Sequence, residues 1–264
     1  MIVRAITFLR PTYLAGLTAV LSASICLAQP TEASSSLTTK CLNGQGYCIM
    51  NSFVDSDKVA SILSSLSSHG EINRYKEVSK GRLHYNLLRS TFVESKVIKD
   101  LIAEHLLPIA VSELGVEVNQ MVMTEVQVVD SLPGSDIQIW HADNAKRGIT
   151  FIIPLVDLTN QNGPTELITG SHSLWNNTFG WICGYGGENG FSLSLVKPLL
   201  RSGDCLIMDA RLLHRGGANL SDTSRPILVI RYDSVKSQPP GMTVIGATAR
   251  FYFARVICFL IEFR

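Results

Sequence analysis

The sequence predicts a mainly β fold with flanking helices, of the jelly-roll (cupin-like) type. From Asn119 onward, short apolar runs alternate with turns rich in glycine and proline. This pattern is typical of antiparallel sheets rather than of βαβ units. Two candidate metal-ligand histidines, His141 and His214, lie 73 residues apart. That separation suits a double-stranded β-helix, because strands distant in sequence lie side by side in such a fold.

Length and composition indicate one folded domain with extensions. The chain has 264 residues, of which 46% are hydrophobic and 17% charged. Lysine and arginine number 23 and aspartate and glutamate 22, which leaves a net charge of +1. No basic stripe or charged tail is present, so nucleic acid is not an expected partner.

The N-terminal segment has the features of a targeting sequence. Residues 1–28 contain Arg4 and Arg10, no acid, and an apolar run that ends in small residues, as a cleaved secretory signal peptide does. We therefore expect the secretory pathway, either the ER lumen or the exterior. A mitochondrial presequence is the alternative, because arginines without acids suit it too. An uncleaved anchor is less favoured, since serine and threonine dilute the apolar run.

Composition divides the rest of the chain into three segments. The serine- and threonine-rich residues 29–40 are predicted to be a linker, and residues 41–240 a single domain with its core at 119–233. Residues 241–264 form an apolar extension that is short and interrupted by charge. It is too short to span a bilayer convincingly, and a helix packed on the sheet, an interfacial segment and a truncated anchor are open alternatives for it. Membrane association through either terminus is possible but not expected.

Cysteine spacing leaves one pairing open. Cys41 and Cys48 bracket a stretch with two glycines, which allows a small disulfide loop; two unpaired thiols are the alternative. The sequence has no C-x-x-C pair, so a structural zinc site is not expected.

The elements before residue 119 are predicted to brace a larger sheet. Asp55 or Ser56 can cap a helix that ends at Gly70. Residues 81–88 follow as a strand, and residues 97–107 as a second helix that Pro108 kinks or divides.

The region from residue 119 is predicted to supply the strands of the jelly roll. Turns at residues 132–134, 162–164 and 202–204 separate several of them. The expected strands cover residues 121–129, 135–139, 150–156, 193–196, 205–208 and 226–232.

One face of the predicted strand at 135–139 leads into two candidate metal ligands. Because side chains alternate along a strand, Ile137, Ile139, His141 and Asp143 should share a face. Trp140 should then point to the opposite face and pack in the core. With His214 as a third arm, two imidazoles and one carboxylate match the ligand set of a non-haem iron(II) site, which leaves three positions open.

A cation follows the third candidate ligand on the last strand. Arg225 lies 11 residues beyond His214 and shares a face with Ile227 and Val229. A guanidinium grips a carboxylate through two parallel hydrogen bonds, so Arg225 is the candidate for holding an anionic co-substrate.

Together these residues resemble the phytanoyl-CoA dioxygenase family of iron(II)- and 2-oxoglutarate-dependent oxygenases. The resemblance covers roughly residues 124–232. Its motifs are His141-x-Asp143, the run 162–172, Ser202-Gly203-Asp204, His214, Asn219-x-Ser221 and Arg225-Pro226. Thr169 replaces the family's usual proline before Gly-Ser-His, and the stretch before the site does not match well enough to assign further residues.

The resemblance implies the function. His141, Asp143 and His214 would bind iron(II), Arg225 would hold 2-oxoglutarate, and O2 would be the co-substrate. The expected reaction hydroxylates or desaturates an unactivated C–H bond of a small organic substrate, with succinate and CO2 as co-products. Asp143 argues for hydroxylation or desaturation rather than halogenation, since halogenating relatives lack that carboxylate. Two alternatives are a catalytically silent jelly-roll binding module and a cupin-like metal-dependent hydrolase.

Several other polar residues carry no strong pattern. His172 is expected to organise its own loop rather than to bind metal, and Arg215 and Arg231 are cations near the site without an assigned role. Arg82, His84 and Tyr85 are minor candidates for the substrate mouth, on a strand expected to be exposed. The remaining histidines, His69 and His105, are expected to be structural or surface residues.

Overall fold

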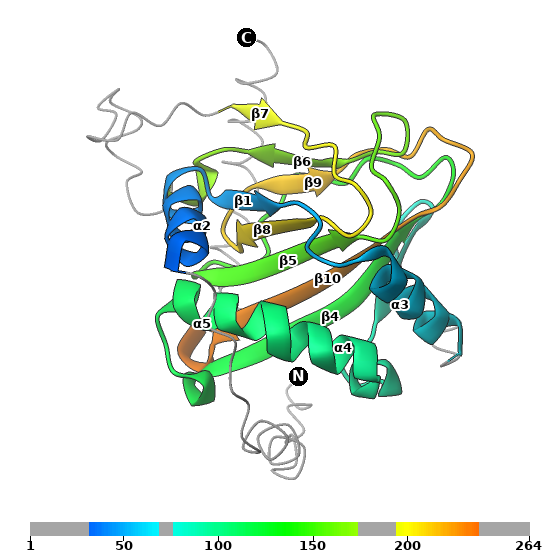
Figure 1. Ribbon diagram of the computed structural model, residues 1–264. Coiled ribbons are helices and arrows are strands. Elements are labelled where there is room, and N and C mark those ends of the chain that lie inside the picture. Colours follow the sequence, from blue (N-terminus) through cyan, green and yellow to red (C-terminus); the bar gives the residue numbers. More distant parts are fainter. Residues whose placement is uncertain (1–31, 69–75, 174–193, 238–264) are drawn as a thin grey trace, which may run out of the picture.

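Two antiparallel sheets face each other in the computed structural model, and helices cover the outer face of the larger one (Figure 1). The structure describes residues 32–68, 76–173 and 194–237. The predicted targeting segment 1–28 and the apolar extension 241–264 lie outside these residues. Among the described residues, no helix is both long and apolar enough to cross a membrane.

The larger sheet contains seven strands. Its central strand β10 lies between β5 and β4, and β5 is buried along its whole length. In spatial order the strands are β1 (Tyr47–Met50), β8 (Cys205–Asp209), β5 (Gly148–Pro154), β10 (Arg225–Ser234), β4 (Met121–Ser131), β3 (Arg82–Asn86) and β2 (Lys76–Ser79).

The smaller sheet has three strands and carries the third candidate ligand. Its order is β7 (Leu195–Val196), β6 (Thr165–Ile168) and β9 (His214–Gly216). An isolated bridge between His141 and His214 adds the His141 segment beside β9. The jelly-roll prediction is therefore confirmed, with the two sheets enclosing the residues of interest.

Alternation along the strands of the large sheet separates two layers of core. Phe151, Leu228 and Ile230 point toward the helices, whereas Ile152 and Val229 point toward the smaller sheet. Burial on both faces explains the near-continuous apolar runs of β5 and β10. The side chains of the large sheet that point toward the smaller sheet form an inward row, and the polar residues of this row lie at the site between the two sheets.

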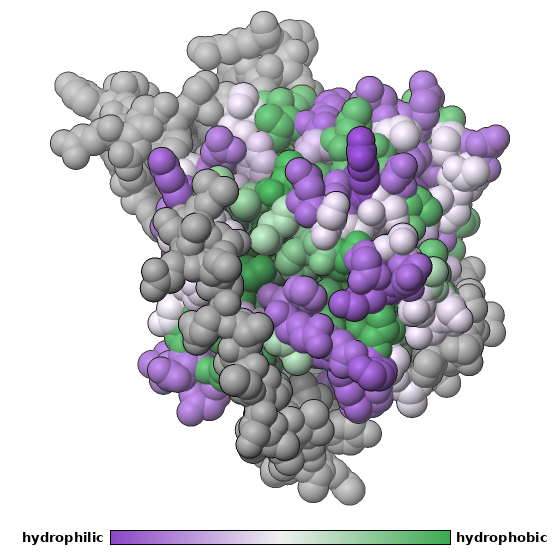
Figure 2. All heavy atoms as spheres, in the orientation of Figure 1, coloured by the Kyte–Doolittle hydropathy of each residue, from purple (hydrophilic) through white to green (hydrophobic). Residues whose placement is uncertain are grey.

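The helices lie on the outer face of the large sheet, where α4 and α5 run across it (Figure 1). Hydrophilic and apolar side chains are intermixed on this face of the molecule (Figure 2). The longer helices are α2 (Glu32–Gly44), α3 (Ser56–Ser68), α4 (Lys96–Leu101) and α5 (Leu107–Leu114), with a π-helical turn η3 (Ile102–Leu106) between the last two. Short 3-10 turns cover Thr91–Glu94, Val118–Gln120, Ser171–Ser173 and Val235–Ser237.

The structure confirms the predicted cap of one helix but not the predicted break in another. Asp55 caps α3, accepting a 2.7 Å hydrogen bond from the Lys58 N–H. Pro108 does not divide its helix: α4 continues through the π-helical turn into α5, and the Leu107 N–H bonds to the Ile102 carbonyl. Pro108 has no backbone N–H to donate, and the wider π-helical turn accommodates it without breaking the helix.

The linker predicted over residues 29–40 is wrong from residue 32, where α2 begins. Tertiary contacts hold this helix despite its many serines and threonines. Leu42 is buried in the core, and the Thr39 hydroxyl donates a 2.7 Å hydrogen bond to Glu113 on α5. Cys41 and Cys48, at its end and on β1, are free thiols in this structure.

The strand predicted over residues 135–139 is also wrong. This segment is a loop, and Ile137 and Ile139 are 44% and 68% exposed. Single backbone hydrogen bonds hold it, from Asp136 to Lys80 and from Gln138 to Gly216. The next pairing along the chain is the isolated bridge at His141. Trp140 does pack in the core as predicted, with Ile168 and Leu213.

Candidate metal centre and cofactor pocket

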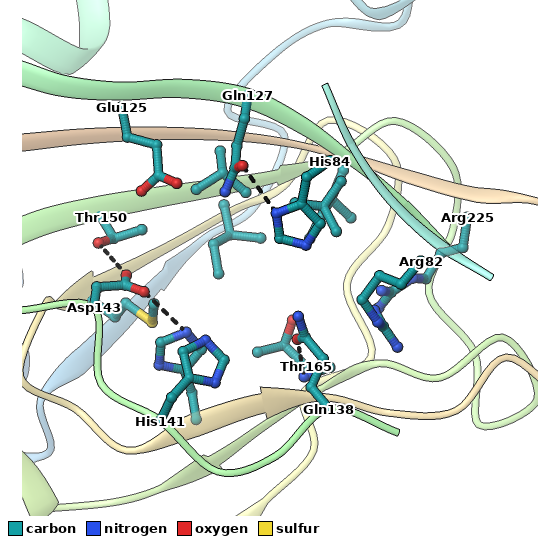
Figure 3. Close-up of a pocket in the computed structure, with 17 residues that line it drawn as sticks. Arg82, His84, Glu125, Gln127, Gln138, His141, Asp143, Thr150, Thr165 and Arg225 are labelled. Atoms are coloured by element: carbon teal, nitrogen blue, oxygen red, sulfur yellow. Dashed lines mark hydrogen bonds and ion pairs between the residues drawn. The ribbon is translucent and has the colours of Figure 1, made fainter. Parts of the chain in front are cut away.

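The structure brings His141, Asp143 and His214 together between the two sheets. One potential ligand atom from each lies within 4.8 Å of the others. All three residues line one pocket, to which strands β3, β4, β5, β8 and β10 of the large sheet also contribute (Figure 3).

Backbone pairing places the two histidines side by side. The His141 N–H donates to the His214 carbonyl at 3.0 Å, and the His214 N–H donates to the His141 carbonyl at 2.9 Å. Their ring centroids are 4.3 Å apart. The 72 residues between them thus return the chain to the same point.

In both histidines, a contact between Nδ1 and the carbonyl oxygen two residues earlier in the chain orients the ring. Nδ1 of His141 lies 2.9 Å from the carbonyl oxygen of Ile139, and Nδ1 of His214 lies 3.0 Å from that of Leu212. A carbonyl oxygen can only accept, so each Nδ1 carries the hydrogen. In the neutral ring each Nε2 then keeps a free lone pair, as in ligand histidines fixed by a backbone carbonyl.

Asp143 supplies the anionic oxygen. Its Oδ1 lies 3.5 Å from His214 Nε2, while its Oδ2 accepts a 2.9 Å hydrogen bond from the Thr150 hydroxyl. Burial opposes the charge of Asp143, but the nearby His214 and Arg231 outweigh burial and hold its pKa below the ordinary value. Burial, then His214, lowers the pKa of His141 to about 4. At neutral pH these two side chains are thus an anion and a neutral imidazole, the forms that bind a metal.

The donor set fits iron(II) better than a structural metal. Two imidazoles and one carboxylate on one side leave positions open for small molecules. Zinc can take the same ligands, so the remainder of the pocket must distinguish the two.

Two buried arginines at the far end of the pocket distinguish an iron site from a zinc site. Arg82 and Arg225 are both 0% exposed, and both donate to the Ser131 hydroxyl oxygen at 2.6 Å. Arg82 also donates to the carbonyls of Gly217 and Asp136, and Arg225 to that of Gly163.

The groups that accept hydrogen bonds from these two cations are neutral. Within the described residues neither guanidinium forms an ion pair, and the Nε of each is buried without a partner. Burial lowers the pKa of Arg82 to about 10; burial and then Arg82 lower that of Arg225 to about 9. Buried charge is costly unless it is paired, so this end of the pocket is built for an anion such as a carboxylate.

Amide and hydroxyl side chains lie between the metal ligands and the arginines (Figure 3). Gln138 and Thr165 line this part of the pocket, and the Gln138 Oε1 accepts from the Gly216 N–H at 2.8 Å. On the opposite wall, Nδ1 of His84 lies 3.1 Å from Gln127 Oε1, and its Nε2 is buried without a partner.

Sequence reasoning missed much of this lining. Gln127, Gln138 and Thr165 carried no signal of their own. Arg82 and His84 were expected at an exposed substrate mouth, but both line the pocket. Tyr85, the third of that group, packs instead against the core beneath the helices. Alternation in β3 could have separated Tyr85 from its neighbours.

A buried ionic cluster stands behind Asp143. Arg231 contacts Glu125 at 2.8 Å, Asp233 at 3.2 Å and Asp143 at 3.9 Å. Burial raises the pKa of Glu125 to about 7, although Arg231 acts against the rise. Arg231, left without a role by the sequence, is therefore the cation nearest the metal ligands in the described part of the chain.

Two other predicted roles can be placed. His172 is not among the clustered ligands; it is buried in its loop, with Nε2 3.3 Å from the Asn43 carbonyl oxygen. Arg215 lies outside the pocket lining, where it stacks on Trp140 at 4.3 Å and pairs with Glu166 at 2.7 Å.

Comparison with known proteins agrees with this geometry. The model of the family described as phytanoyl-CoA dioxygenase matches residues 42–227. Multifunctional dioxygenase prhA of Penicillium brasilianum is 24% identical over 221 residues, which cover 74% of this chain and 71% of that protein. Dioxygenase easH of Epichloe festucae var. lolii is 28% identical over 103 residues, which cover 34% of this chain and 51% of that protein.

Solved structures share the fold. The epimerase SnoN, in complex with Fe3+, alpha ketoglutarate and nogalamycin RO, superposes with a TM-score of 0.62 at 20% identity, covering 80% of this chain and 88% of that one. The non-heme alpha ketoglutarate dependent carbocyclase SnoK from nogalamycin biosynthesis gives a TM-score of 0.59 at 16% identity, covering 77% and 86%.

Proposed function

The chain belongs to the phytanoyl-CoA dioxygenase family and is a non-haem iron(II)- and 2-oxoglutarate-dependent dioxygenase; we propose that it hydroxylates or desaturates an unactivated C–H bond of a small organic substrate. Succinate and CO2 are the co-products. The observation that carries the proposal is one pocket with a His/Asp/His cluster near one end and, at the other, two buried arginines that form no ion pair within the described part of the chain.

Each end has a defined task. His141, Asp143 and His214 would hold the iron, with two imidazole nitrogens and a carboxylate oxygen as the donors. Arg225 and Arg82 would receive the far carboxylate of 2-oxoglutarate, whose charge would offset their burial. A cupin-like hydrolase would give these two arginines no role.

The residues between the ends orient the co-substrate and limit water. Gln138 and Thr165 offer hydrogen bonds along its length, while Val129, Ile152 and Met208 supply apolar wall. When bound, iron(II) with 2-oxoglutarate and O2 supplies the oxidising power, and the protein confines it to a dry, shaped site.

Charge in the site favours an uncharged reacting group on the substrate. Above pH 7, where Glu125 is ionised, the acids and arginines around the pocket balance, three cations against three anions, and iron(II) with the 2-oxoglutarate dianion adds no net charge. A charged group placed beside the iron would therefore have no partner and would be costly to bury. The balanced groups are Arg82, Arg225, Arg231, Glu125, Asp143 and Asp233.

The test is 2-oxoglutarate turnover over a panel of uncharged and charged organic compounds, with succinate and product mass as readouts. We expect uncharged compounds to stimulate succinate release and to gain one oxygen atom or lose two hydrogens. A product of unchanged mass would instead indicate epimerisation and contradict the proposed reaction. Stimulation by no compound, with an intact iron site, would favour the binding-module alternative.

We also propose a location. The arginines and the apolar run of residues 1–28 support entry into the secretory pathway. A fusion of the full chain to a fluorescent protein should label the ER or appear outside the cell. Mitochondrial labelling would contradict this location and favour a presequence.

A further inference from the structure

The two carboxylate oxygens of Asp143 have different surroundings. Oδ1 faces the histidine, 3.5 Å from His214 Nε2. Oδ2 accepts a 2.9 Å hydrogen bond from the Thr150 hydroxyl and lies 3.9 Å from Nη1 of Arg231. One oxygen is thus free to meet a metal, while the other is held by the large sheet.

Strand register places both holding groups. Thr150 on β5 and Glu125 on β4 lie directly opposite Arg231 on β10. Their side chains therefore emerge on the same face of the sheet, under Asp143. Asp143 lies in the loop after His141, whereas both groups that hold its Oδ2 stand on paired strands of the large sheet.

Arg231 is itself fixed on several sides. Its Nη1 lies 2.8 Å from Glu125, and its Nε donates to Asp233 and to the Thr124 hydroxyl, each at 3.2 Å. Asp233 in turn accepts from the Asn144 amide at 2.7 Å and from Thr124. A Cβ at Gly148 would lie 2.2 Å from Asp233 Oδ1, so only glycine at that position leaves room for this arrangement.

We propose that Thr150 and Arg231 are positioning residues that keep Asp143 a one-oxygen ligand, with Oδ1 on the metal and Oδ2 held away from it. This inference rests on the proposed iron site. A carboxylate that binds through both oxygens takes one more coordination position. A site with two imidazoles and one carboxylate needs its three open positions for the co-substrates, so a released Oδ2 would compete with 2-oxoglutarate.

Thr150 gives the cleaner test, because its hydroxyl contacts only Asp143 among the hydrogen bonds of the described residues. Thr150→Val removes the hydroxyl at nearly constant shape, and Thr150→Ser keeps it as the matched control. The metal-free protein is loaded with iron(II) under argon and titrated with 2-oxoglutarate, and the visible charge-transfer absorbance is followed.

We expect Thr150→Val to bind iron(II) but to lose affinity for 2-oxoglutarate by about tenfold or more, with a shifted absorbance maximum. Thr150→Ser should stay close to the wild type in both. A merely structural role for Thr150 would lower the thermal unfolding midpoint and leave the maximum and the 2-oxoglutarate affinity unchanged, and that result would overturn the inference.

Arg231→Lys is the second variant, because it keeps the charge among Glu125 and Asp233 but loses the planar fork. It should weaken 2-oxoglutarate binding in the same direction. Absence of any charge-transfer band in the wild type would refute the proposed function itself. A normal wild-type band with unchanged titrations in both Thr150→Val and Arg231→Lys would refute only the positioning role.

Discussion

Arg82 and Arg225 donate to the same hydroxyl oxygen, that of Ser131, each at 2.6 Å. Strand register creates this meeting, because Ser131 on β4 lies directly opposite both residues, on its two neighbouring strands. Two fully buried cations thus converge on one neutral group at one end of the pocket. Four predictions follow from this end, from the ionisable groups beside the metal and from the metal ligands.

Loss of either arginine should weaken 2-oxoglutarate binding. We expect Arg225→Met and Arg82→Met each to cost about 2 kcal/mol or more, roughly thirtyfold in Kd, since a buried carboxylate would lose a charged partner. Titration of the iron-loaded protein measures this. Arg201→Met, at an exposed position, is the control and should bind normally; equal affinity in all the variants would contradict the assignment.

The same substitution should affect stability much less. In Arg225→Met, relief of an unpaired buried charge opposes the loss of hydrogen bonds to Ser131 and Gly163. We expect the free energy of unfolding without 2-oxoglutarate to stay within about 1 kcal/mol of the wild type. Excess 2-oxoglutarate should raise the unfolding midpoint of the iron-loaded wild type, because it binds only the folded state, but not that of the variant. A large loss of stability without ligand would show that Arg225 is mainly structural.

The candidate ligand His141 and the nearby Glu125 should make the stability of the metal-free protein depend on pH in opposite directions. His141 has a folded pKa of about 4, below its unfolded value of about 6.5, so it stabilises the metal-free protein above pH 6.5 and this stability is lost as pH falls toward 4. Glu125 has a folded pKa of about 7, above its unfolded value of about 4.3, so its stability is present at low pH and lost as pH rises toward 7.

Urea unfolding of the metal-free protein across this range separates the two groups. Relative to the wild type, His141→Asn should lose less stability on acidification, and Glu125→Gln should lose less as pH rises. Identical pH profiles in the wild type and both variants would show that neither group titrates differently on folding.

The candidate ligands could be predicted because the sequence carries their geometry locally. His141 and Asp143 are two positions apart, and His214 and Arg225 stand at the start of strands or beside turns. The packing of Trp140 in the core also followed from alternation. The same rule failed for Ile137 and Ile139, because single hydrogen bonds hold that segment as a loop, where alternation need not place side chains on a buried face.

The rest of the pocket depends on contacts that no short pattern encodes. Arg82 becomes a pocket residue only because β3 pairs with β4 in a register that sets it against Ser131. Arg231 gains its role from neighbours on β4 and β5 that are distant in sequence. Helix α2, expected to be a linker, forms where Leu42 and the bond from Thr39 to Glu113 tie it to the domain, and local propensity does not report such contacts.

The most direct test of the account is binding of iron(II) and 2-oxoglutarate without oxygen. Metal-free wild type mixed with iron(II) and 2-oxoglutarate under argon should develop a visible charge-transfer band, and His141→Ala and Asp143→Ala should not, although both keep the folded circular dichroism spectrum. With oxygen and a substrate, both variants should also fail to form succinate. A wild type without the band, or a variant with full turnover, would contradict the assignment of the metal centre.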